Sequence, residues 1–323
     1  MQKDFYDFVV IGAGAAGLTA SQYGARSGLD TLLIDSSDAG GQALNIFTLE
    51  NFPGFFPAVK GRTFIDNMQA QAQSFGAEIA QARVKSIDKI KNQFIIKTDK
   101  GEIKTYTVLL ATGAEHRKLG AKGEKEFNGL GVSYCATCDG PFFRGGKIFV
   151  VGGGDSACEE AFYLSSLSEN VTLVHRRDQL RAQKAIQHKI QKNKNITVLY
   201  NTEIQQIKGS KKVESVVLKN TLTGQIEEEV ADAVFIFVGM NPRTELVSML
   251  RRDEGGYLIT NYRMETSVPG MYAAGDVRAK PFRQLITAAS DGAIAAHQAH
   301  EFVTLIKNSK INSVATQAED TAK

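Results

Sequence analysis

Short apolar runs separated by helical stretches recur along the chain, and this pattern predicts buried strands joined by helices. The apolar run Phe8–Ile11 leads through a glycine-rich turn into a helical stretch that ends near Ser27, and a second apolar run, Thr31–Ile34, follows. The same order returns between Lys147 and Val174. Two such strand-helix-strand units predict an α/β protein with two Rossmann-like, three-layer nucleotide-binding domains.

The first glycine turn spans Gly12–Gly17 and joins a strand to a helix. In such a turn the first glycine allows the tight bend, the second lets a pyrophosphate approach the backbone, and the third lets the helix pack on the strand. The free N–H groups at the start of the helix then face the phosphates. Asp35 ends the second strand, where a carboxylate accepts hydrogen bonds from a ribose. The predicted contacts of this dinucleotide site are Gly12, Gly14, Ala15, Gly17 and Asp35.

The second glycine turn follows the strand Lys147–Val151 and opens a helix that ends near Ser168. The same physical reasoning predicts a second dinucleotide site, in which helix N–H groups face the phosphates. Its candidate residues in the turn are Gly152, Gly154, Asp155 and Ser156.

The two copies differ at the position of the ribose-binding acid. Where the first copy has Asp35, the second has His175, followed by Arg176 and Arg177, with Arg181 one turn further on. Guanidinium groups bind a phosphate through charge-assisted hydrogen bonds, whereas a carboxylate would repel it. The cations therefore predict that the second site takes NADPH rather than NADH.

Between the two copies lies a pair of cysteines, Cys135 and Cys138, followed by Asp139. Their spacing allows a short redox-active disulfide, and Asp139 is placed to supply the proton that a leaving thiolate takes up. A structurally buried pair and a zinc site are the alternatives. A zinc site would also need Cys158 and His175, which fall on separate elements, so we expect no metal and treat Cys158 as an inert core thiol.

The order of these motifs predicts an electron route. A disulfide does not readily accept hydride, so a flavin is expected between NADPH and the cysteines, and the first domain is expected to bind FAD. The cysteines closely precede Gly152, which places the dithiol and the NADPH site in one domain. Because nicotinamide and disulfide then need the same flavin, we expect the NADPH domain to rotate on its linkers.

Two buried strands that end in glycine, residues 108–113 and 234–239, are expected to close the two nucleotide domains. Thr112, within the first, is a candidate cofactor contact. Each strand is followed by an irregular stretch, residues 114–123 and 240–244, and these are the linker candidates.

The chain is expected to return to the first domain after the second linker. The strand 271–276 consists of small residues and ends in Gly275 and Asp276, at the edge where such sheets place ligand contacts. The prediction is therefore a discontinuous FAD domain with an inserted NADPH domain. Their predicted ranges are 1–115 and 245–323 for the FAD domain and 116–244 for the NADPH domain.

The remaining segments carry weaker patterns. Residues 78–107 and 198–226 alternate in hydropathy and predict antiparallel meanders, whereas the polar tail from Asn308 is expected to be unstructured.

Composition narrows the setting. Lys and Arg number 38 against 35 Asp and Glu, so the net charge of +3 gives no reason to expect a nucleic-acid partner. With three cysteines in 323 residues, a disulfide framework is not expected, which favours a reducing, cytoplasmic location. The chain has no run of about 18 apolar residues, so no membrane-spanning helix is predicted.

Taken together, the motifs resemble the bacterial-type, low-molecular-weight, NADPH-dependent thioredoxin reductases. The match runs from Gly12 to about Phe302 and is most specific at residues 135–140, 152–160 and 175–181. The resemblance implies an enzyme that passes electrons from NADPH through FAD and a redox-active disulfide to thioredoxin or a thioredoxin-like protein. It also implies a homodimer.

The resemblance further implies roles for individual residues. Cys138 is expected to lie against the flavin, Cys135 to attack the thioredoxin disulfide, and Asp139 to act as acid and base. Amide and carboxylate side chains suit the mixed donors and acceptors of a flavin and its ribityl chain. The residues that the resemblance assigns to FAD are Gly40, Gly41, Gln42, Asn51, Gly275, Asp276, Arg283 and Gln284.

Three departures from the family pattern leave the redox pair untouched. Cys158 replaces an aliphatic residue, residues 119–123 lack a proline, and Arg243 stands where Asn is common. Two alternatives to a reductase remain, a dithiol oxidase that passes electrons to oxygen and a flavin-binding sensor without turnover. The arginine cluster argues against the oxidase, since an oxidase needs no NADPH.

Overall fold

A computed structural model describes residues 3–46, 49 and 51–321, and in it the chain forms two compact units. The first unit comprises residues 1–115 and 241–323, and the second comprises residues 116–240. Each unit is built on a mainly parallel sheet with helices on one face, so the predicted α/β class with two Rossmann-like folds is confirmed.

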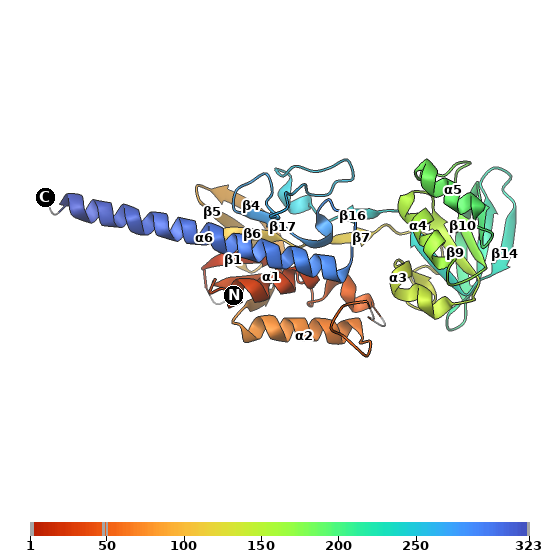
Figure 1. Cartoon of the computed structure of the whole chain (residues 1–323), viewed down its shortest axis with the longest axis horizontal. Helices are drawn as coiled ribbons and strands as arrows, with labels where there is room; N and C mark the ends of the chain where they lie inside the picture. Colours follow the sequence, from red (N-terminus) through yellow and green to blue (C-terminus); the bar gives the residue numbers. More distant parts are fainter. Residues whose placement is uncertain (1–2, 47–48, 50, 322–323) are drawn as a thin grey trace. The chain divides into compact units, whose positions relative to one another are not determined.

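The first unit holds a seven-stranded sheet in the order β3-β2-β1-β6-β5-β4, with β17 also paired to β6 (Figure 1). Neighbours among β1, β2, β3, β6 and β17 run parallel, whereas β4, β5 and β6 form an antiparallel meander. The strands are β1 (Phe5–Ile11), β2 (Thr31–Asp35), β3 (Glu78–Gln81), β4 (Val84–Ile90), β5 (Gln93–Thr98), β6 (Gly101–Leu110) and β17 (Met271–Ala273).

Alternation along β1 divides the core of this unit into two layers. Phe8 and Val10 belong to the core layer that contains the helices, whereas Val9 and Ile11 belong to a second layer with residues of the meander such as Ile87. The helices are α1 (Ala15–Arg26), α2 (Gly61–Ser74) and α6 (Leu285–Thr321), with short turns η1 (Gly41–Asn45), η3 (Glu245–Val247) and η4 (Gly275–Val277).

Helix α6 is longer than the sequence predicts. It continues through Asn308 to Thr321, where an unstructured tail was expected. After Asn308 no glycine or proline interrupts the chain before Thr321, and alanine, glutamine and glutamate are good helix formers. Among the described helices, α6 included, none combines the length and the apolar character that crossing a bilayer requires.

The second unit repeats the plan with a five-stranded parallel sheet in the order β11-β10-β9-β15-β8. Helices cover one face, and an antiparallel meander of three strands covers the other. The sheet strands are β8 (Val132–Ser133), β9 (Ile148–Gly152), β10 (Val171–Val174), β11 (Ile196–Leu199) and β15 (Ala233–Phe237), and the meander strands are β12 (Thr202–Gly209), β13 (Val213–Asn220) and β14 (Ile226–Val230). The helices are α3 (Ala136–Asp139), α4 (Asp155–Leu164) and α5 (Lys184–Lys192), with the short turn η2 (Gly140–Phe143).

The two predicted meanders are present, but each begins later than the hydropathy pattern suggested. β3 lies within the first predicted range and β11 overlaps the second, yet both pair in parallel at the edge of their main sheets. Short amphipathic strands look alike in the sequence whichever way they pair, so only the partner strand decides the direction.

The connecting segments are shorter than the predicted linkers. Strands β7 (Ala114–His116) and β16 (Met240–Pro242) pair with each other where the chain passes between the units. The rest of the first predicted linker belongs to the second unit, because the buried Glu124 carboxylate accepts the N–H groups of Leu119 (2.9 Å) and Gly120 (2.7 Å).

The second passage between the units lies between Met240 and Asn241, whereas the sequence prediction put it after residue 244. Two hydrogen bonds explain the difference. The Arg243 N–H donates to the carbonyl of Gly113 at 3.0 Å, and Arg252 Nη2 donates to the carbonyl of Thr244 at 2.8 Å. All four residues belong to the first unit.

Candidate active site

The first glycine turn connects β1 to α1 at the carboxyl end of the parallel sheet. Gly12 has a φ of +107°, and a Cβ there would lie 2.3 Å from the Ala111 carbonyl oxygen, so only glycine fits. A Cβ on Gly14 would have no neighbouring atom within 4 Å, and Gly14 caps α1 without any side-chain hydrogen bond. Asp35 Oδ2 accepts the Ala13 N–H at 2.7 Å, which fixes the carboxylate beside the turn. Free N–H groups at the start of a helix suit an anion such as a pyrophosphate.

Other residues that the resemblance assigns to FAD gather around this turn. The Gly40 N–H donates to the Ala13 carbonyl at 2.8 Å, and a Cβ on Gly41 would lie 3.7 Å from the Gly14 Cα. Gly275 approaches from a distant part of the sequence, since a Cβ there would lie 3.0 Å from the Ala16 Cβ. The fold of the first unit therefore brings three separated glycine-containing segments to one place.

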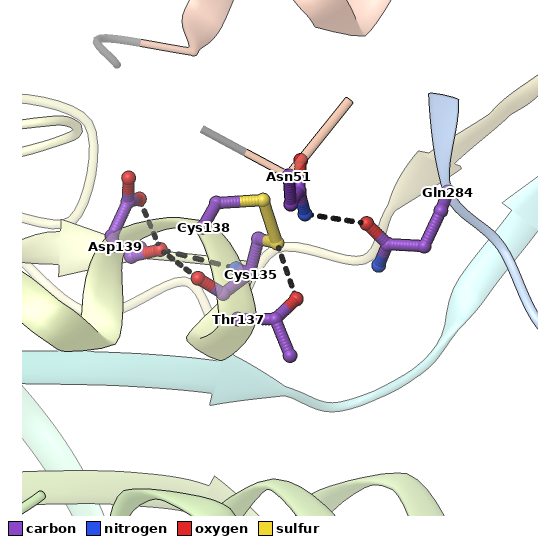
Figure 2. Close-up of a disulfide and its surroundings, with 7 residues drawn as sticks. Asn51, Cys135, Thr137, Cys138, Asp139 and Gln284 are labelled. Carbon is purple, nitrogen blue, oxygen red and sulfur yellow. Dashed lines mark hydrogen bonds between the residues drawn. A yellow bond between two sulfur atoms is a disulfide. The ribbon is translucent and has the colours of Figure 1, made fainter. Parts of the chain in front are cut away.

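The polar members of the same predicted set are held by hydrogen bonds within the first unit. Asn51 Nδ2 donates to Gln284 Oε1 at 3.2 Å, although the two residues are 233 positions apart (Figure 2). Gln42 Nε2 donates to the Ala114 carbonyl, and Thr112 Oγ1 donates to the Arg243 carbonyl at 2.6 Å.

A buried ionic cluster that sequence reasoning missed supports Asp276. Lys280 Nζ lies 3.0 Å from Asp291 Oδ2 and 3.5 Å from Asp276 Oδ1, and only 5% of the Lys280 side chain is exposed. Asp291 is also bound by Arg278 Nη1 at 2.9 Å and by the Gly275 N–H at 3.0 Å. Burial raises the pKa of Asp276, and Lys280 opposes that rise. The sequence gives no signal for this cluster, because α6 supplies Asp291 only after it packs.

The second glycine turn has the same form as the first. β9 ends at Gly152, and Gly154 caps α4 without a side-chain hydrogen bond, so the first N–H groups of the helix are free of intrachain caps. Ser156 is exposed at the start of α4. Asp155 is engaged with the chain itself, because its Oδ1 accepts the Gln183 N–H at 2.7 Å.

The cationic segment after β10 lies beside this turn. His175 is 5% exposed and its Nε2 is buried without a hydrogen-bond partner among the described residues, while burial lowers its pKa. Arg176, Arg177 and Arg181 are exposed, and within the described chain no ion pair occupies their guanidinium groups. A segment with free guanidinium groups beside a phosphate-binding turn suits a phosphorylated ribose.

Cys135 and Cys138 form a disulfide at the start of α3, with an S–S distance of 2.11 Å (Figure 2). Both cysteines are partly exposed, as a disulfide that exchanges with another protein must be. Thr137 Oγ1 lies 3.5 Å from Cys135 Sγ. Helix α3 packs on α4, because a Cβ at Gly140 would lie 2.8 Å from the Leu164 side chain. The disulfide and the second glycine turn are therefore parts of one packed unit.

Asp139 lies on the same turn as the disulfide, and Ser133 anchors it. Ser133 Oγ donates to Asp139 Oδ2 at 2.6 Å and accepts the Cys135 N–H at 3.0 Å. Burial raises the pKa of Asp139, and the hydrogen bond from Ser133 opposes that rise. A carboxyl group with a raised pKa beside a disulfide suits proton transfer to a thiolate. Sequence reasoning missed Ser133, whose one signal is its place two residues before Cys135.

The third cysteine differs in environment from the other two. Cys158 is fully buried on α4, and burial raises the pKa of its thiol to about 11, with Asp155 and Glu159 adding to the rise. Such a thiol is not reactive. In the described part of the chain, no three His, Cys, Asp or Glu side chains are grouped so that they could hold a metal ion.

The residues of the first unit fit FAD on the evidence of their unsatisfied atoms. Arg283 Nε is buried without a hydrogen-bond partner among the described residues, and such an atom needs a partner. Asp276 Oδ1 is buried as well, with the Lys280 ammonium 3.5 Å away. In the second unit the unpartnered His175 Nε2 and the free arginines fit a dinucleotide phosphate in the same way. Each unit thus has an uncapped helix N-terminus together with polar groups that a cofactor would satisfy.

Two Rossmann-like sheets, one of them in the same unit as an accessible disulfide, define a disulfide oxidoreductase of the two-cofactor class. Comparison with protein families agrees. The family model of pyridine nucleotide-disulphide oxidoreductases matches residues 6–297, and the chain belongs to this family. The thioredoxin reductases of this family use FAD and NADPH.

Individual relatives narrow the class further. A thioredoxin reductase of Treponema pallidum is 52% identical over 308 residues, which cover 95% of this chain and all of the relative. A thioredoxin reductase of Bacillus subtilis is 44% identical over 304 residues, 94% of this chain and 96% of the relative. The crystal structure of thioredoxin reductase from Streptococcus pyogenes superimposes with a TM-score of 0.88 at 42% identity, covering 93% of this chain and 99% of that one.

Proposed function

We propose that this chain is an NADPH-dependent thioredoxin-disulfide reductase. The observation that carries the proposal is the partly exposed disulfide Cys135–Cys138, held in the same unit as the uncapped glycine turn and the free arginines. The similarity to thioredoxin reductases favours a reductase over the dithiol oxidase and the sensor that the sequence left as alternatives.

The proposal divides the work between the two units. Residues 1–115 and 241–323 bind FAD around the Gly12 turn, and residues 116–240 bind NADPH around the Gly152 turn. Bound FAD supplies the two-electron carrier that accepts hydride from NADPH and passes the electrons to a disulfide. The two units rotate about their connecting segments, so that nicotinamide and disulfide reach the flavin in turn.

The chain's own residues then carry the exchange with thioredoxin. The Cys135 thiolate attacks one sulfur of the thioredoxin disulfide, forming a mixed disulfide and releasing the other sulfur as a thiolate. Asp139 gives its proton to that leaving thiolate. The Cys138 thiol gives its proton to the Asp139 carboxylate, and the resulting thiolate attacks the Cys135 sulfur, which restores the Cys135–Cys138 disulfide. The second thioredoxin sulfur leaves as a thiolate and takes the proton back from Asp139. Two electrons pass to thioredoxin in each cycle.

The setting follows from the same proposal. The partner is thioredoxin or a thioredoxin-like protein, the active form is a homodimer, and the location is the cytoplasm. The disulfide is partly exposed, which supports a protein partner, since a disulfide enclosed in a core could not exchange with another protein.

An anaerobic titration tests the proposal. The FAD-loaded protein is titrated with NADPH, with and without oxidised bacterial thioredoxin, while flavin absorbance and free thiols are followed. Without thioredoxin, we expect NADPH to bleach the flavin and to release the two thiols of Cys135 and Cys138. With thioredoxin, the thiols are expected to appear on thioredoxin instead, in proportion to the NADPH consumed.

Two serine variants make the titration specific. Cys138→Ser should still bind FAD and be bleached by NADPH, but should not reduce thioredoxin. Cys158→Ser is the matched control. Because Cys158 is buried, this substitution should leave thioredoxin reduction unchanged. Thioredoxin reduction that persists in Cys138→Ser, or NADPH consumption matched by oxygen uptake under air with no thioredoxin thiols, would contradict the proposal.

A further inference from the structure

The segment that carries the three arginines has no helix or strand of its own, yet its backbone is tied to the second glycine turn. The Gly153 carbonyl accepts the N–H groups of Arg181 (2.6 Å) and Ala182 (3.1 Å). The His175 ring packs against the same glycine, since a Cβ on Gly153 would be 2.2 Å from the ring. Any side chain at Gly153 would therefore push the cationic segment away from the phosphate-binding turn.

Two side chains hold the far end of the segment from opposite sides. On α4, Asp155 Oδ1 accepts the Gln183 N–H at 2.7 Å. On α5, Gln187 Nε2 donates to the Ala182 carbonyl at 2.6 Å and to the Leu180 carbonyl at 3.2 Å. The backbone on both sides of Arg181 is therefore fixed, while the guanidinium itself is exposed.

The position of Asp155 is otherwise hard to explain in an anion site. It is the first residue of α4, and a carboxylate beside the phosphates of a dinucleotide would repel them. The hydrogen bond to Gln183 gives the carboxylate a partner within the chain. The sequence predicted a cofactor contact for Asp155, and the structure adds a hydrogen bond within the chain.

We propose that Asp155 and Gln187 are positioning residues for cofactor choice, which set the distance between the phosphate-binding turn and Arg181. The 2′-phosphate is the one group that distinguishes NADPH from NADH, and binding it together with the pyrophosphate requires both parts of the site to be held at the right separation. The inference rests on the proposed assignment of Arg176, Arg177 and Arg181 to the 2′-phosphate.

Equilibrium binding tests this inference without turnover. Isothermal titration calorimetry on the FAD-loaded protein gives the Kd values for NADP⁺ and NAD⁺. We expect Asp155→Ala to lower the preference for NADP⁺ over NAD⁺ roughly tenfold, the effect of losing about one hydrogen bond to a charged group. Gln187→Met removes the amide donor on the other side and should lower the NADP⁺ preference in the same direction.

Conservative and neighbouring variants separate positioning from charge. Asp155→Asn keeps an oxygen that accepts the Gln183 N–H, so it should retain the NADP⁺ preference, and its loss of charge should affect both dinucleotides alike. Glu159→Ala removes an exposed acid from the same helix and should leave the preference unchanged. Amide hydrogen exchange at Gln183 should become faster in Asp155→Ala but not in Asp155→Asn, with the rest of α4 protected as before.

The outcomes distinguish the inference from the assignment beneath it. If Arg176→Ala with Arg177→Ala weakens NADP⁺ and NAD⁺ equally, the 2′-phosphate assignment in the proposed function is wrong. If that pair removes the preference while both Asp155→Ala and Gln187→Met retain it, the assignment stands and the positioning role is wrong. An Asp155→Asn protein that loses the preference as fully as Asp155→Ala also overturns the positioning role.

Discussion

Lys280 offers a sharp test of how the buried ionic cluster supports the first unit. The substitution Lys280→Met keeps a long unbranched side chain but removes the ammonium that lies 3.0 Å from Asp291 and 3.5 Å from Asp276. Because the Lys280 side chain is only 5% exposed, water cannot replace the lost charge. We therefore expect the variant to be less stable than the natural protein.

The magnitude follows from what remains after the change. Removing one partner of a buried ion pair costs about 3 to 5 kcal/mol. Asp291 keeps Arg278 and the Gly275 N–H, so the loss should fall near the lower end, at about 3 kcal/mol. Asp276 loses its nearest cation, and the pKa of its carboxyl should rise further above the ordinary value.

This rise gives the loss a definite pH dependence. A carboxyl group whose pKa is higher in the folded than in the unfolded protein takes up its proton more readily when folded, so protonation favours folding. The variant should therefore regain part of the lost stability as the pH falls from neutral toward 3.8, the ordinary pKa of an aspartate. The difference between variant and natural protein should be larger at about pH 8 than at about pH 5.

Urea unfolding at saturating FAD measures the loss. The chain contains no tryptophan, so far-ultraviolet circular dichroism is the better probe. Lys97→Met is the matched control, because Lys97 and Asp88 form a pair at 4.0 Å in which both side chains are more than half exposed. The control should cost less than about 1 kcal/mol. A loss for Lys280→Met no greater than for Lys97→Met, or one that does not shrink at the lower pH, would refute the reasoning.

Two further predictions concern titratable groups in the second unit. Burial, and secondarily Glu159, raises the pKa of Glu160 from 4.5 to about 7, so the folded protein should lose stability as the pH rises through that window. Glu160→Gln should therefore raise the free energy of unfolding by about 1 to 2 kcal/mol at pH 8. This gain is less than the full linkage value of about 3 kcal/mol, because the side chain is partly exposed. The substitution should change nothing near pH 4, and an equal gain at both pH values would contradict the pKa assignment. Ser133→Ala removes the hydrogen bond that opposes the rise in the pKa of Asp139, so the alkaline limb of the pH profile for thioredoxin reduction should move to higher pH, at a cost in stability of about 1 kcal/mol. A profile that stays in place or moves to lower pH would show that Asp139 is not the group that titrates.

The parts of the site that the sequence predicted are those whose residues lie within one short stretch of chain. The first glycine turn and Asp35 belong to a single strand-helix-strand unit, and the bond from the Ala13 N–H to the Asp35 carboxylate closes within it. Cys135 and Cys138 likewise need only one turn of helix to come together. Local spacing was enough in both cases because few backbone torsions separate the groups.

The parts that the sequence did not predict depend on distant packing or on the choice of hydrogen-bond partner. Lys280 and Asp291 meet because α6 lies over the sheet, and no local pattern records that contact. Asp155 has the residue type and position of a cofactor contact, yet its carboxylate accepts the N–H of Gln183. Several N–H and O–H donors were open to that carboxylate, and only the path of the chain after β10 decided among them.

The redox disulfide is connected to the end of the second unit by a short series of side-chain contacts. Tyr134 precedes Cys135, its ring stacks on His116 with centroids 5.0 Å apart, and Lys118 Nζ lies 4.2 Å from the ring centre. The Tyr134 hydroxyl donates to the buried carboxylate of Glu124 at 2.6 Å. Burial, and then Lys118, lowers the pKa of His116 to about 4, so the ring is uncharged at neutral pH and does not repel the ammonium. These contacts therefore join His116, the first residue of the second unit, to the residue directly before Cys135.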